Sequence, residues 1–183
     1  LHIVMDLLSL QFIEVLVSDV HTGETLKHFT LTPGDVVLAD RGYAQCQGMC
    51  AAVQQGAALI VRLNPFSVVL SDAAGAPLEL STALKRQKTA TLRTLVVTLR
   101  AAGGQHEVQG WVHAYRLNTE QANRARQKCR QGHKKGAPSA ASLLLAGWVL
   151  VFTTLAPAVL SAQTIMVLYR CRWQVEIAIK RWK

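Results

Sequence analysis

The sequence predicts an α/β fold, in which helices cover a β-sheet, and three observations support this prediction. The chain opens with two β-like runs at residues 1–7 and 12–19. A strand–helix–strand pattern follows between residues 36 and 64, as expected for a layered sheet. From Tyr169 to Lys183 the chain closes on a stretch without proline or glycine, in which apolar and charged residues recur with helical spacing.

The opening segment supplies the first elements of this layer. The short link between the first two runs predicts an antiparallel pair, and Thr22 is the candidate cap of a short helix over residues 21–29. A turn at Pro33 and Gly34 follows. The apolar run at residues 36–40 then lacks alternation, which predicts a strand covered on both faces.

Asp40 stands at the carboxyl end of this predicted strand. A helix over residues 44–55, ended by Gly56, leads to a second buried strand at residues 58–64. Functional residues of α/β sheets gather at the carboxyl ends of strands, which makes Asp40 a candidate site residue. The alternative is that Asp40 caps the turn that begins at Arg41, a role in which aspartate is common.

The residue pattern changes in the middle of the chain. Short alternating runs separated by glycine-containing turns predict a β-rich unit. We therefore expect a core at residues 1–65 and 146–183, and a β-rich insertion with a basic helix at residues 66–145. Asn118 is the candidate cap of that helix. The cations of the helix suit phosphate contacts, although a solvated helix or linker is equally consistent with them.

Two aromatic residues of the insertion, Trp111 and His113, have no assigned role. An exposed tryptophan can stack on an unpaired base, but tryptophan is more often a core residue.

Residues 137–168 contain no charged side chain. The apolar part of this segment, residues 140–160, approaches the length of a transmembrane helix. Thr153, Thr154 and Pro157 interrupt it, and its β-branched and aromatic residues are typical of a buried strand. These features favour a core strand followed by a helix capped near residue 161, without a membrane partner; a membrane-associated protein is the less favoured alternative.

The net charge of +9 favours a polyanionic partner, with nucleic acid ahead of an anionic membrane surface. The basic residues concentrate between Arg116 and Lys135 and in the closing helix. The cysteines lack the spacing of a metal finger and are interpreted as thiols in a reducing cytoplasm. They are Cys46, Cys50, Cys129 and Cys171.

The closing helix carries an unusual stripe of side chains. Because a helix advances about 100° per residue, five side chains fall within an arc of roughly 80°. They are Tyr169, Arg172, Glu176, Lys180 and Lys183. A carboxylate in such a stripe can hold a divalent metal, while arginine and lysine bind phosphates. The alternative is a solvated ion pair between Glu176 and Lys180 on an ordinary amphipathic helix.

This stripe resembles a known signature. Two residues separate Tyr169 from Arg172, three separate Arg172 from Glu176, and six separate Glu176 from Lys183. The pattern resembles the Tyr-Arg-Glu-Lys signature of bacterial insertion-sequence transposases of the DDE class. The string GDVVLADRGY, which contains Asp40, resembles the segment around the second catalytic aspartate of the same class. The resemblance implies a ribonuclease-H-like (retroviral-integrase-like) core with a β-rich insertion before the helix that supplies the glutamate.

The resemblance also implies a site and a reaction. Asp40 and Glu176 correspond to catalytic carboxylates that hold Mg²⁺, with Mn²⁺ as the alternative, in a two-metal site. The reaction would be metal-dependent DNA strand cleavage and strand transfer during transposition of an insertion element. The expected DNA contacts are Tyr169, Arg172, Lys183, Lys180 and Arg41.

The family pattern needs one more carboxylate, an aspartate on the first core strand. The resemblance places it upstream of Leu1, so that Asp6 and Asp19 become ordinary strand or turn residues. We therefore expect a core that is incomplete at its N-terminus, a fragment that is inactive alone, and a bacterial, cytoplasmic full-length protein that forms a homodimer. A non-catalytic, basic DNA-binding fragment is the alternative function.

Overall fold

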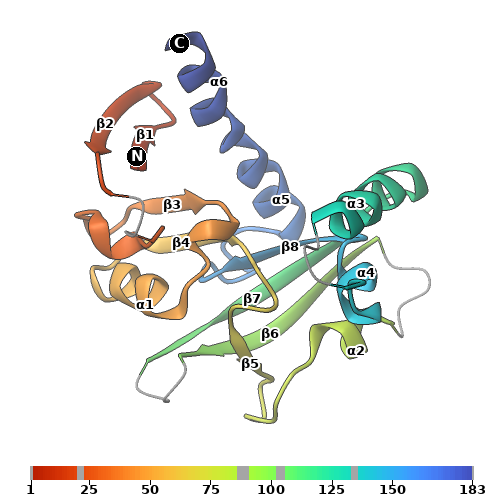
Figure 1. The fold of residues 1–183 in the computed structure, drawn as a ribbon. Coiled ribbons are helices and arrows are strands. Elements are labelled where there is room, and N and C mark those ends of the chain that lie inside the picture. The colour runs from red at the N-terminus through yellow and green to blue at the C-terminus, as the bar shows by residue number, and fades with distance from the viewer. Residues whose placement is uncertain (1, 20–22, 86–90, 102–105, 133–135, 183) are drawn as a thin grey trace.

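The computed structural model describes residues 2–19, 23–85, 91–101, 106–132 and 136–182 (Figure 1). The strands are β1 (His2–Asp6), β2 (Gln11–Leu16), β3 (Val36–Ala39), β4 (Ala58–Arg62), β5 (Val69–Ser71), β6 (Leu92–Arg100), β7 (Glu107–Arg116) and β8 (Trp148–Thr153). The helices are α1 (Cys46–Gln54), α2 (Leu80–Lys85), α3 (Thr119–Gly132), α4 (Ala140–Leu145), α5 (Ala162–Cys171) and α6 (Trp173–Trp182). Two short 3₁₀ helices, η1 (Leu26–His28) and η2 (Arg41–Tyr43), complete the described elements.

Six strands form one mixed sheet in the order β3-β4-β8-β7-β6-β5. β3 and β4 are parallel, and every other neighbouring pair is antiparallel. The carboxyl ends of β3, β4 and β7 therefore lie at the same edge of the sheet, together with the start of β8. We call this edge the carboxyl edge. The predicted α/β class is confirmed as a mixed α/β fold.

Helices cover both faces of the sheet. On one face, α1, α2 and α4 bury the larger core, which includes Leu59, Val61 and Phe152. On the other face, α5 packs on β3, β4 and β8 and buries Ile60 and Val151. Alternate residues of one strand thus enter opposite cores, as the pleat of a strand requires.

The predicted strand–helix–strand unit is present as β3, α1 and β4. Gly56 ends the helical segment with φ +85, a conformation that favours glycine. The run at residues 36–40, which forms β3, was predicted to be covered on both faces. This prediction is wrong, because Val36 is 47% exposed. Within the described residues β3 is an edge strand, so its outer side is left open.

The antiparallel pair predicted at the start of the chain is β1 and β2, which form a separate two-stranded sheet. His2 ties this hairpin to the main body, since its Nδ1 lies 3.2 Å from Tyr43 Oη. The expected helix over residues 21–29 is the shorter η1, capped by Thr25, while Thr22 lies outside the described residues.

The strands of residues 66–145 belong to the same sheet as those of the flanking segments. β7 pairs with β8, and β8 pairs with β4, so the hydrogen bonding is continuous from β5 to β3. The division of the chain into a core and an insertion stays a prediction.

The uncharged segment forms β8 and the start of α5, as its pattern predicted, and also the short helix α4, which was not predicted. Ser161 caps α5, with its hydroxyl 3.1 Å from Thr164 N. None of the helices in the described parts of the chain is both long and apolar enough to cross a membrane.

The closing helix differs in detail from the uninterrupted helix expected from Tyr169 onward. It starts at Ala162, close to the predicted start near residue 161, but it is divided at Arg172 into α5 and α6. Arg172 N bonds Tyr169 O at 3.2 Å, and Val175 N bonds Arg172 O at 3.2 Å. These three-residue spacings tighten the helix for one turn, so the signature residues straddle a local change of geometry.

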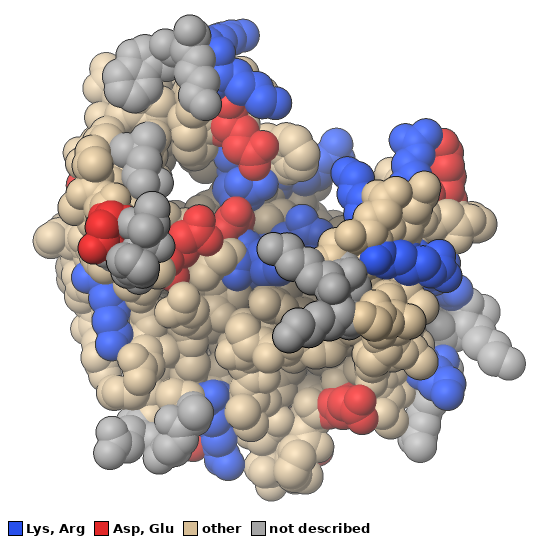
Figure 2. Space-filling model, viewed as in Figure 1, with Lys and Arg blue, Asp and Glu red and all other residues tan. Residues whose placement is uncertain are grey.

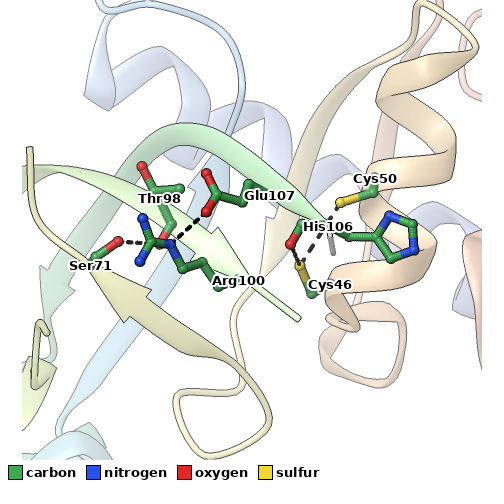
Figure 3. A network of polar contacts seen from close by, with 7 residues as sticks. All are labelled: Cys46, Cys50, Ser71, Thr98, Arg100, His106 and Glu107. Atoms are coloured by element: carbon green, nitrogen blue, oxygen red, sulfur yellow. Dashed lines mark hydrogen bonds and ion pairs between the residues drawn. The ribbon is translucent and has the colours of Figure 1, made fainter. Parts of the chain in front are cut away.

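A polar network lies at the other edge of the sheet, where β6 ends and β7 begins (Figure 3). Arg100 Nε and Glu107 Oε1 are 2.7 Å apart. Beside them, Cys46 Sγ lies 3.6 Å from His106 O and 3.9 Å from Cys50 Sγ. Burial, followed by the neighbouring Cys50, raises the pKa of the Cys46 thiol to about 12. This thiol is therefore protonated at neutral pH and poorly reactive.

Candidate functional site

Asp40 sits at the carboxyl edge, on the face of the sheet that α5 covers. Ala39 is buried in the larger core and Leu38 packs on the α5 side, so strand alternation directs Asp40 to the α5 side. Asp40 Oδ1 accepts a hydrogen bond of 2.9 Å from Gly42 N and thereby caps η2. The capping role is thus present, and it leaves the second carboxylate oxygen to other partners.

Glu24 brings a second carboxylate to this position. A Cβ built on Gly42 would overlap the Glu24 carboxylate and would lie 3.4 Å from Asp40 Oδ1. The two carboxylates are therefore neighbours across Gly42, and a larger residue there would displace the exposed Glu24 side chain. Burial, followed by the charges of Glu24 and Asp40, raises the pKa of the Tyr43 phenol to about 12.

Two arginines stand beside Asp40. Arg62 ends β4, and the pairing of Ala39 with Val61 places it at the same level as Asp40 on the same face. The pKa of Arg41 is lowered, first by partial burial of its guanidinium and then by the like charge of Arg62. Tyr169 also acts on the Arg41 pKa, in the opposite direction, so the start of the signature lies close to this arginine.

The signature residues on α5 and α6 form a compact cluster. Tyr169 is only 5% exposed, and its hydroxyl has no hydrogen-bond partner among the described residues. Arg172 Nη2 lies 2.8 Å from Glu176 Oε1, with side chains 14% and 39% exposed. Burial disfavours the charge of Arg172, but the hydrogen bond and charge of Glu176, together with Tyr169, raise its pKa overall. The Arg172 guanidinium also lies 5.8 Å from the ring centres of Tyr169 and Trp173.

This cluster differs from the ion pair considered from the sequence. Glu176 pairs with Arg172, one turn before it, rather than with Lys180, which is exposed on α6. Lys183 lies outside the described residues.

The structure brings some of the sequence-predicted site residues together and leaves others apart. Arg41, next to Asp40, is close to Tyr169 at the carboxyl edge. The described contacts of Glu176 are with Arg172, and no described contact joins its carboxylate to Asp40. Within the described residues, no group of three or more His, Cys, Asp or Glu side chains is placed to hold a metal ion.

Asp6 takes the place expected of an ordinary turn residue. Its Oδ1 accepts from Leu8 N at 3.0 Å, and its Oδ2 accepts from Ser9 Oγ at 2.7 Å. These hydrogen bonds, led by that from the Ser9 hydroxyl, lower its pKa. Asp6 thus stabilises the β1–β2 turn.

The two aromatic residues singled out in the sequence lie on β7. Trp111 is partly buried. His113 is fully buried, with Nδ1 2.9 Å from Thr94 Oγ1, and its Nε2 has no partner among the described residues. Burial lowers the pKa of His113. Its contacts are those of a core residue of the sheet.

Glu24 and Arg62, which lie beside Asp40, were not predicted as site residues from the sequence. Glu24 lies in the segment expected to be a short helix, where no motif marks it as a site residue. Arg62 could have been predicted as a site residue, because it is the charged residue that ends a buried strand, β4, at the level of Asp40.

The surface of the molecule has a basic hollow beside the signature helices (Figure 2). Figure 2 shows Lys and Arg side chains gathered between the α5–α6 helices and α3, with acidic side chains at its rim. Asn118 caps α3 as predicted, since its Oδ1 accepts from Gln121 N at 2.9 Å. The hollow therefore has one wall from the signature helices and another from the predicted basic helix.

Comparison with known proteins agrees with this arrangement. The family model described as "Transposase DDE domain" matches residues 1–183. No curated protein and no solved structure matches the chain significantly. Since the match spans the whole sequence, the chain belongs to the family of transposase DDE domains.

Proposed function

We propose that this chain carries part of the catalytic site that cleaves and transfers DNA strands during transposition of an insertion element. The family implies DNA cleavage linked to transposition, with DNA as the partner. The observation that carries the finer proposal is the position of Asp40. It ends β3 on the sheet face that α5 covers, beside Arg41, which in turn is close to Tyr169 of the signature.

The carboxylates at this edge, Asp40 and Glu24, belong to the chemical type that binds a hard divalent cation. Carboxylate oxygens are the ligands that Mg²⁺ and Mn²⁺ prefer. Asp40 and Glu176 would hold the metal, and Glu24, next to Asp40, is a further candidate. Bound there, a divalent metal would supply Lewis acidity for activating the attacking hydroxyl and stabilising the leaving oxygen.

The remaining side chains have roles in binding DNA. Arg41 and Arg62 lie side by side, and neither belongs to any of the described ion pairs, so a phosphate would relieve their mutual repulsion. Arg172 is held by Glu176 and is available to a strand that passes over the signature. Tyr169, Lys180 and Lys183 are the other proposed contacts.

A third carboxylate would come from an upstream aspartate, as in a ribonuclease-H-like core. Two strand edges support this proposal. Among the described residues β1 pairs only with β2, and β3 pairs only with β4, so each has an unpaired edge. A strand between them would join the hairpin to the main sheet and would end near Asp40. We also propose the core-and-insertion division, a homodimer and a bacterial cytoplasmic location.

The alternative is a fragment that binds DNA without cutting it. The observation in its favour is that Asp40 and Glu176 already have partners within the chain, the η2 turn and Arg172.

A charge-neutralising substitution tests the catalytic proposal. In a chain extended upstream to the first aspartate, Glu176→Gln should abolish cleavage of DNA carrying the element end, because the amide is a poor metal ligand. DNA binding should change little, since the cations remain. Cleavage is measured on labelled DNA with Mg²⁺, and binding by gel shift.

The matched control is Glu120→Gln, which neutralises a carboxylate on α3, away from Asp40. The control should cleave like the parent. If Glu176→Gln cleaves as fast as the parent, Glu176 is not a catalytic residue and the non-catalytic alternative is favoured.

A further inference from the structure

The basic helix α3 lies along the carboxyl edge of the sheet, from β7 toward β3. Near its start, Leu117 N donates to Gly147 O at 3.0 Å, which fixes it beside the beginning of β8. Near its end, Cys129 contributes to the pKa of Arg41, beside Asp40. Figure 1 shows α3 on the opposite side of α5–α6 from the β1–β2 hairpin. The last turns of α3 are therefore next to the candidate site.

Packing does not account for the charge of this helix. Ala122 is its one buried residue in the described part of the chain. Arg124 is paired with Glu120 on the exposed surface. Lys128 and Arg130 are exposed, and neither belongs to a described ion pair. They flank Cys129 in sequence and so project on either side of it.

The hollow between the two walls is positively charged on several sides. Arg41 and Arg62 lie at the carboxyl edge, Arg172 stands on the signature helices, and α3 adds Lys128 and Arg130. Figure 2 shows these walls facing each other across the hollow. Arg172 is paired with Glu176, but the other four belong to no described ion pair, and such like charges repel one another unless a polyanion lies between them.

We propose that a DNA strand lies between α3 and α5–α6, and that Lys128 and Arg130 contact its phosphates. The signature helices form one wall of this groove and α3 forms the other. The proposal rests on the proposed function and adds to it a second DNA-binding surface, contributed by the segment expected to be an insertion. The recognition is of backbone phosphates and carries no base specificity.

Chemical modification of the native cysteines tests where the DNA strand lies, and it needs no substitution. Cys129 is partly exposed on α3, and Cys171 is exposed on α5, roughly 200° around the helix from Tyr169. Saturating duplex DNA should slow alkylation of Cys129 by N-ethylmaleimide severalfold, as measured by peptide mass spectrometry. Cys171, which is exposed on the side of α5 opposite Tyr169, should react at its original rate. Unchanged alkylation of Cys129 would overturn the proposal.

Salt dependence tests the contacts themselves. For the 183-residue chain, Lys128→Ala and Arg130→Ala should each lower the slope of log affinity against log salt by about 0.9, the value for one phosphate contact. Arg124→Ala is the matched control, because it removes a cation of the same helix that is already paired with Glu120. Its slope should equal that of the parent.

The outcomes separate this inference from the function on which it rests. If the parent binds DNA with a steep salt slope and neither α3 substitution alters that slope, α3 is a solvated helix. The proposed DNA-binding surface on α3 is then wrong, while the proposed function stands. If the parent shows no salt-dependent binding to DNA, both the inference and the proposed function fail.

Discussion

Asp40 and Glu176 are each held by a residue close to them in sequence. Gly42 N binds Asp40 Oδ1 at 2.9 Å, and Arg172 Nη2 binds Glu176 Oε1 at 2.8 Å. Both carboxylates are thus oriented by the chain itself, which reduces the freedom lost when a cation or phosphate arrives. Arg172 links the two roles, because it orients a proposed metal ligand and is itself a proposed DNA contact.

Residue types and spacing predicted these side chains but not all of their partners. Arg172 and Lys180 both lie four residues from Glu176, so helical spacing alone cannot choose between them. Arg172 also packs over the Tyr169 and Trp173 rings, which fixes its position. Glu24 lies beside Asp40 only because the fold brings η1 and η2 together, and no local pattern carries that information.

His113 makes stability depend on pH. Burial lowers its pKa in the folded protein below the ordinary 6.5, so the folded state stays neutral while the unfolded state takes up a proton. The contribution of His113 to stability is therefore present above pH 6.5 and is lost as the pH falls below that value. The free energy of unfolding, measured by urea denaturation between pH 7.5 and 5, should fall less steeply with pH in His113→Gln than in the parent. Identical slopes would show that His113 protonates equally in both states.

Individual elements could be predicted where the sequence carries its own boundary signals. Gly56 ends the helical segment after α1, Asn118 caps α3 and Ser161 caps α5, each as expected. The order of the strands could not be predicted, because hydrogen bonds between β4, β8 and β7 join residues far apart in the sequence. The exposure of β3 was missed for the same reason, since an apolar run does not say whether a neighbouring strand follows.

The pairing of β7 with β8 depends on one glycine. A Cβ on Gly110 would overlap Thr153 O and would lie 2.7 Å from Phe152 Cζ, both within the sheet core. Gly110→Ala should therefore destabilise the protein by about 1–3 kcal/mol, the usual cost of overpacking. The matched control is Gly132→Ala in α3, where nothing lies within 4 Å and alanine favours the helix by up to about 1 kcal/mol. Urea denaturation measures both, and equal stability of the two variants would contradict this packing.

At the scale of the whole molecule, the charged residues of the candidate site lie at the carboxyl edge of the mixed sheet. Arg41, Arg62 and Arg172 lie where β3, β4 and the signature helices meet, whereas the Arg100–Glu107 pair and the buried cysteines lie at the other end of β6 and β7. Within the described residues, β1 and β3 each have one unpaired edge. The family and the charge are together consistent with a domain that acts on DNA.

The most direct test of this account asks whether Asp40 and Glu176 share one metal. Fe²⁺ in place of Mg²⁺, supplied with ascorbate and peroxide, cuts the polypeptide backbone next to the ion. In the chain extended upstream, the account predicts cuts both near Asp40 and within α6 near Glu176, with both suppressed together by excess Mg²⁺. Cuts at only one of these positions, or at neither, would contradict it.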